Sequence, residues 1–152
     1  VKPVELYRGA DELNQVVKLY GKGATGTSRL GAAPDAPHRG KLRRAYNRIT
    51  SVRDQWLEYR FDCGRDALPL EGVTGNGDSG GPALIKKDGT WQLAGLAHGL
   101  DGSGHDLANE HSMLRAGDFR LGTCGQEFAD SRISYYARWI DSVTTRSEHT
   151  SQ

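Results

Sequence analysis

Short apolar segments separated by glycine-rich stretches make up most of the hydrophobic pattern of this chain. Residues 16–20 (VVKLY) are rich in strand formers, and residues 56–61 (WLEYRF) contain the apolar-polar alternation of a half-buried strand. Residues 83–85 and 91–97 are two further apolar runs, and they flank the pair Asp88-Gly89, a strong signal of a β-hairpin. The pattern predicts a domain built mainly from β-strands.

The hydrophobic period changes near the C-terminus. Apolar residues between 136 and 143 recur at three- and four-residue spacing, which is the period of an amphipathic helix. Ser131 and Ser134 are both candidates for the N-cap of this helix. We expect the helix to run from about Ser134 to Val143 and the polar tail, residues 144–152, to be frayed.

Length, composition and charge narrow the class of protein. The 152 residues suit one domain, and 20 glycines favour many tight turns, with residues 21–40 as a long loop. The net charge of +1 gives no reason to expect a nucleic-acid partner. No run approaches the 18 or more apolar residues of a membrane span, so we expect no membrane partner either.

The two cysteines, Cys63 and Cys124, do not form a metal motif, because neither has a second cysteine or a histidine at ligand spacing. We therefore expect no metal. Their spacing leaves open whether they form a disulfide or remain two buried thiols. A bridge closing this loop would stabilise the fold by roughly 4 kcal/mol in the chain-entropy model.

The stretch TGNGDSGGPALI, residues 74–85, places glycines at positions 75, 77, 80 and 81 around Ser79. Glycine is used where the backbone takes a positive φ or passes close to another group. One interpretation is a backbone shaped to present the Ser79 hydroxyl and the neighbouring N–H groups. The alternative is a glycine-rich surface turn.

The hexapeptide Gly77-Asp78-Ser79-Gly80-Gly81-Pro82 resembles the nucleophile motif of chymotrypsin-like (trypsin-fold) serine peptidases, and LEGVTGNGDSGGPALI is most similar to their bacterial secreted branch. Residues 93–97 resemble the strand that lines the family's pocket, and residues 131–140 its closing stretch into the C-terminal helix. The resemblance implies an all-β fold: an antiparallel six-stranded Greek-key barrel, the second half of the trypsin fold, with a C-terminal helix. It assigns residues 1–143 to this barrel, including an interdomain segment, residues 1–12.

The resemblance implies a serine endopeptidase without cofactors, secreted or periplasmic, that acts on proteins or peptides. Ser79 would attack the scissile carbonyl, and the N–H groups of Gly77 and Ser79 would form the oxyanion hole. Asp78 would order this loop by pairing with the amine freed when a zymogen is cleaved. Val1 does not suit that role, because the sequence VKPV differs from the family's N-terminal pattern.

The resemblance also assigns the substrate pocket to two short segments. They are Val73, Thr74, Gly75 and Asn76 on one wall and His98, Gly99 and Leu100 on the other. Val73 stands where trypsin-type enzymes carry an aspartate, so we expect the pocket to favour an uncharged side chain. His98 is either a strand-end histidine with a structural hydrogen bond or a catalytic part, and Glu71 is either a pocket charge or a solvated loop residue.

No histidine of this chain lies in the sequence context that the family uses for its general base. The base histidine and its aspartate are therefore expected on an N-terminal peptidase half or a companion chain, and this chain alone is expected to be inactive. An alternative is a non-catalytic peptidase-like binding domain or an inactive fragment. A third interpretation takes G-x-S-x-G as an α/β-hydrolase elbow with Ser79, Asp106 and His111.

Overall fold

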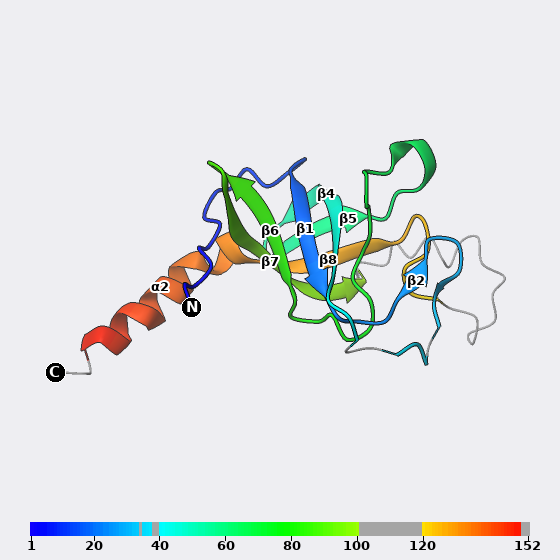
Figure 1. The fold of residues 1–152 in the computed structure, drawn as a ribbon. Coiled ribbons are helices and arrows are strands. Elements are labelled where there is room, and N and C mark those ends of the chain that lie inside the picture. The colour runs from blue at the N-terminus through cyan, green and yellow to red at the C-terminus, as the bar shows by residue number, and fades with distance from the viewer. Residues whose placement is uncertain (34, 38–39, 101–119, 150–152) are drawn as a thin grey trace.

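Six antiparallel strands close into a barrel in the computed structural model, which describes residues 1–33, 35–37, 40–100 and 120–149. The barrel strands are β1 (Val16–Gly21), β4 (Arg43–Arg53), β5 (Trp56–Arg60), β6 (Pro82–Lys87), β7 (Thr90–Leu100) and β8 (Glu127–Arg132). Their order around the barrel is β1-β4-β5-β8-β7-β6, with β6 pairing back onto β1. Helix α2 (Ile133–His149) follows β8 directly and projects away from the barrel (Figure 1).

The strand order makes the chain cross from β5 to β6 instead of forming a hairpin there. This crossing, residues 61–81, carries the short 3-10 helix η1 (Gly64–Asp66) and the loop that contains Ser79. A second small sheet, β2 (Gly26–Thr27) with β3 (Gly31–Ala32), interrupts the long loop between β1 and β4. Both connections are loops that the barrel strands hold in position. Binding and catalytic residues of proteins commonly lie on such loops.

The all-β barrel with a C-terminal helix confirms the predicted fold class. The strands predicted at residues 16–20, 56–61, 83–85 and 91–97 correspond to β1, β5, β6 and β7. The alternation does not reveal β4, because its inward positions include the small Ala45 and the buried polar Asn47. It does not reveal β8 either, because that strand turns the carboxyl of Asp130 into the interior.

The predicted start of the helix, about Ser134, lies one residue from the observed start at Ile133, but the predicted end at Val143 is wrong. Helix α2 continues to His149, so residues 144–149 are helical and not frayed. The hydroxyl groups of Thr144 and Thr145 donate to carbonyls one turn earlier, so these polar side chains find their partners within the helix. Neither N-cap candidate flanks the helix start, since Ser131 lies in β8 and Ser134 in the first turn.

The barrel interior holds the hydrophobic core. The buried core cluster includes the rings of Tyr7, Tyr59 and Phe128 and the aliphatic side chains of Val17, Leu19, Ile49, Leu57 and Ile85. Cys63 and Cys124 form a disulfide with their Cα atoms 5.9 Å apart, so the open question of their state is decided in favour of the bridge. The bridge joins the connection after β5 to the segment before β8.

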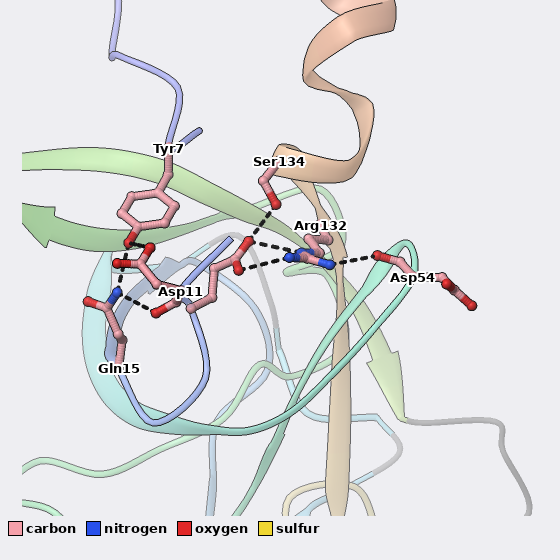
Figure 2. A network of polar contacts seen from close by, with 7 residues as sticks. Tyr7, Asp11, Gln15, Asp54, Arg132 and Ser134 are labelled. Carbon is pink, nitrogen blue, oxygen red and sulfur yellow. Dashed lines mark hydrogen bonds and ion pairs between the residues drawn. The ribbon is translucent and has the colours of Figure 1, made fainter. Parts of the chain in front are cut away.

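Residues 1–12 pack on the barrel. The N–H of Tyr7 donates to the carbonyl of Leu93 in β7, and the N–H of Leu93 donates to the carbonyl of Glu5. Glu12 is completely buried, and its carboxylate accepts two hydrogen bonds of 2.9 Å from the Arg132 guanidinium. Figure 2 shows this pair together with the hydroxyl of Ser134, which donates to the same carboxylate. The pair holds the N-terminal segment against the junction of β8 and α2.

We predict that Glu12→Gln lowers the free energy of unfolding by about 3 kcal/mol, because a buried guanidinium left without its carboxylate is costly. Urea unfolding followed by tryptophan fluorescence measures this loss. Asp141→Asn is the matched control: it breaks the bidentate pair with Arg8, in which both side chains are about half exposed (52% and 54%), and should cost less than about 1 kcal/mol. Equal losses in the two variants would contradict the structural role of Glu12.

Candidate active site

The loop that contains Ser79 is held by backbone hydrogen bonds to β7. The N–H of Gly80 donates to the carbonyl of Ala97 at 2.8 Å, and the N–H of Ala97 donates to the carbonyl of Gly81 at 2.9 Å. Gly77 and Gly80 have φ values of 93° and 79°, in the left-handed region that favours glycine. Ser79 itself is exposed. The glycines therefore shape a loop that presents this hydroxyl to solvent.

The carboxylate of Asp78 ties the Ser79 loop to the segment that follows β1. One oxygen accepts a 2.6 Å hydrogen bond from the N–H of Gly23, and the other accepts 2.9 Å from the N–H of Gly75. A Cβ atom on Gly23 would lie 2.5 Å from the Asp78 carboxyl carbon, so the close approach requires glycine there. Val1 is exposed and bonds to neither oxygen of this carboxylate.

A cavity of about 420 Å³ opens beside Ser79. The structure brings most of the sequence-predicted pocket residues to its wall: Thr74, Gly75, Asn76, His98, Gly99 and Leu100, with Gly77 and Ser79. Val73 does not line it and instead lines a neighbouring cavity of about 400 Å³ that lies toward Asp78. Thr74 and Gly75 line both cavities, whereas Val73, which was predicted to select the substrate side chain, lines only the neighbouring one.

Two lining residues, Ala32 and Leu121, were not identified from the sequence. They form an isolated antiparallel β-bridge with each other. Small and aliphatic side chains carry no motif, so only the fold places them beside Ser79.

The His98 ring packs on Trp56 of β5, with the two ring centroids 4.9 Å apart and the planes tilted by 45°. Among the described residues, His98 and Ser79 share no hydrogen bond. The contact with Trp56 fixes where the ring lies, and the two interpretations of His98, a structural hydrogen bond or a catalytic part, both stay predictions. His38, Asp106, His105 and His111 lie outside the described residues.

Two of the sequence interpretations are overturned here. The Ser79 loop runs into strand β6 and not into a helix, so an α/β-hydrolase elbow is excluded. The Glu71 carboxylate accepts hydrogen bonds from the N–H groups of Asp62 at 2.7 Å and Leu68 at 2.5 Å. Glu71 is therefore a structural acceptor that organises the β5–β6 crossing and not a solvated loop residue, and it lines the neighbouring cavity of about 400 Å³.

A buried hydrogen-bonded chain runs from the cavity wall into the barrel. The side chain of Thr74 bonds to the Tyr59 hydroxyl, which donates to one carboxyl oxygen of Asp130 at 3.1 Å. The other Asp130 oxygen has no hydrogen-bond partner among the described residues. Burial raises the pKa of Asp130 to about 7. Sequence reasoning missed this group, because nothing in the sequence marks Asp130 as inward-facing.

Among the described residues, no group of three or more histidine, cysteine, aspartate or glutamate side chains is placed to hold a metal ion. In the same part of the chain, no helix combines the length and apolarity needed to cross a membrane.

Comparison with known proteins identifies the fold. No protein-family model and no curated protein matches this chain. Among solved structures it is similar to neuropsin, a serine protease expressed in the limbic system of mouse brain, with a TM-score of 0.60 at 19% sequence identity. The match covers 95% of this chain and 54% of neuropsin, so the chain spans about half the length of that protein. The likeness establishes a trypsin-like barrel, as the hexapeptide had indicated.

Proposed function

We propose that this chain is the nucleophile-bearing half of a serine endopeptidase of the trypsin-like kind. The observation that carries the proposal is the Ser79 loop, in which an exposed serine stands beside a cavity on a backbone held by Asp78 and β7. The likeness to neuropsin supports a peptidase-like fold for this loop.

In the proposed reaction, the Ser79 oxygen attacks the scissile carbonyl carbon and its proton passes to a base histidine on an N-terminal half or a companion chain. The resulting oxyanion is bound by the N–H groups of Gly77 and Ser79. Among the described residues neither N–H has an acceptor, which supports this assignment. The amine leaves with the histidine's proton, and water then hydrolyses the acyl-enzyme.

The proposed substrates are proteins or peptides with an uncharged side chain for the cavity beside Ser79. No acidic side chain lines the described part of this cavity, so a basic substrate group would find no carboxylate among the described lining residues. The disulfide between Cys63 and Cys124 supports a secreted or periplasmic location, because such bonds persist in oxidising compartments.

An organofluorophosphonate probe tests the proposal, because it labels only a serine activated by a base. We expect this chain alone to remain unlabelled and the protein completed with its base-bearing half to be labelled at Ser79, as peptide mass mapping would show. Ser142→Ala should not change labelling, since that serine lies on exposed helix α2.

Failure of the completed protein to react would favour the alternative, a peptidase-like binding domain without activity. Labelling of this chain alone at Ser79 would mean that the base lies within residues 1–152. Either result would overturn the proposed division of the catalytic groups.

A further inference from the structure

One outer face of the barrel is basic, although the whole chain carries a net charge of only +1. It lies across β4, β1 and β6, which run side by side (Figure 1). We define the basic face by its four cationic side chains: Lys18, Arg44, Arg48 and Lys86. The register places them next to one another, because Arg48 pairs with Val16 and Lys18 pairs with both Tyr46 and Leu84.

Acidic side chains are absent from the outward positions of these strands. Along β1 and β4 the outward residues are Val16, Lys18, Tyr20, Arg44, Tyr46 and Arg48. Two nearby acids are directed to other partners, since Glu71 accepts two backbone hydrogen bonds and Glu5 accepts one of 3.4 Å from Gln92. Among the described residues, Lys18, Arg44 and Lys86 have no ion-pair partner. The face therefore presents three cations without an ion-pair partner among the described residues.

Aromatic rings hold two of the cations in place. The Lys18 ammonium lies 4.5 Å from the centroid of the Trp91 ring and 5.3 Å from that of Tyr20, and the Lys86 ammonium lies 5.9 Å from that of Trp91. Cation–π contacts of this kind restrict long flexible side chains. Because lysines occupy the Trp91 ring, it is not free to stack on nucleic-acid bases. The arrangement suits carboxylates better than bases.

From this charge complementarity we infer that the basic face binds an extended polypeptide segment rich in aspartate and glutamate. The choice of a polypeptide rests on the proposed function, since the substrate of a peptidase is itself a polypeptide. The face is separate from the cavity beside Ser79, whose wall contains none of the four cationic residues. It would act as a second contact that selects substrates with an acidic stretch.

Direct binding tests this inference without any catalysis. The probe is a fluorescein-labelled peptide of alternating glutamate and glycine, and its anisotropy is followed on titration with the Ser79→Ala chain. We expect binding that weakens as salt is added. Combined Lys18→Gln, Arg44→Gln and Lys86→Gln changes should weaken it about tenfold. Failure of the fluorophosphonate experiment would leave this result unaffected.

Two further variants serve as controls. They test whether the weaker binding results from misfolding or from the lower net charge of the whole chain. Arg44→Gln alone should weaken binding about twofold, and it disturbs no described hydrogen bond or ion pair. Combined Lys2→Gln, Arg65→Gln and Arg138→Gln changes remove the same charge from other exposed sites and should leave binding within about twofold of the unchanged chain.

Equal binding by the unchanged and the substituted basic face would overturn the inference. Tighter binding of an oligothymidylate or of a sulfated oligosaccharide than of the acidic peptide, lost in the same variant, would also overturn it. The first result would assign the face to nucleic acid and the second to a glycan.

Discussion

Replacing Ser79 with alanine in the completed protein is expected to lower kcat by about 10⁶-fold while leaving stability unchanged. The loss is that of removing the nucleophile of a serine–histidine unit. Ser79 is exposed, and the loop is held by bonds of its neighbours, so the missing hydroxyl should change the free energy of unfolding by less than about 0.5 kcal/mol. Hydrolysis of an uncharged peptide substrate and urea unfolding are the two measurements.

Asp78→Asn is the informative comparison for this prediction. It removes the charge that accepts hydrogen bonds from the N–H groups of Gly23 and Gly75, so it should loosen the loop. We expect a reduced kcat together with a loss of about 2 kcal/mol in stability. If Ser79→Ala destabilised the protein as much as Asp78→Asn, its inactivity would reflect a damaged loop and not a missing nucleophile.

The second large effect concerns the stability of the protein as pH changes, and it comes from Asp130. In the folded barrel the pKa of this carboxyl is about 7, raised by burial from an ordinary value of 3.8. The folded state therefore keeps a proton that the unfolded chain releases as the pH rises above about 4. The contribution of Asp130 to stability is fully present below that pH and is lost as the pH rises through 7, by about 4 kcal/mol in total.

Asp130→Asn should abolish this fall, because an amide does not ionise. The hydrogen bonds around this side chain can persist in the variant. The Tyr59 hydroxyl can donate to the amide oxygen of asparagine, and Tyr59 keeps its hydrogen bond with Thr74. Urea unfolding measured from pH 4 to pH 8 should give a flatter profile, with the variant more stable than the unchanged chain at pH 8.

Asp88→Asn is the matched control for this pH profile. It makes the same chemical change in the exposed β6–β7 turn, where Asp88 has a φ of 50° that asparagine adopts readily. It should leave the pH profile unchanged. An unaltered profile in Asp130→Asn would show that another group controls the pH dependence.

Several features of this protein are determined by short stretches of its sequence. The turn at Asp88-Gly89 has φ values of 50° and 80°, as expected for a tight hairpin whose two central residues both need a positive φ. Gly77 and Gly80 shape the Ser79 loop in the same way. Backbone preference acts within a few residues, so these elements and the candidate nucleophile are recognisable without a structure.

Only the tertiary structure decided which partners the buried polar side chains and the two cysteines have, and which residues surround Ser79. Closure of β6 onto β1 and of β8 onto β5 brings together residues far apart in the chain, and it buries Glu12 against Arg132 and Asp130 beneath Tyr59. The same closure places Leu121 beside Ser79 and decides that the two cysteines pair. Polar residues at such positions have no local preference for burial, because the free energy of a buried carboxyl depends on the partner that the fold brings to it.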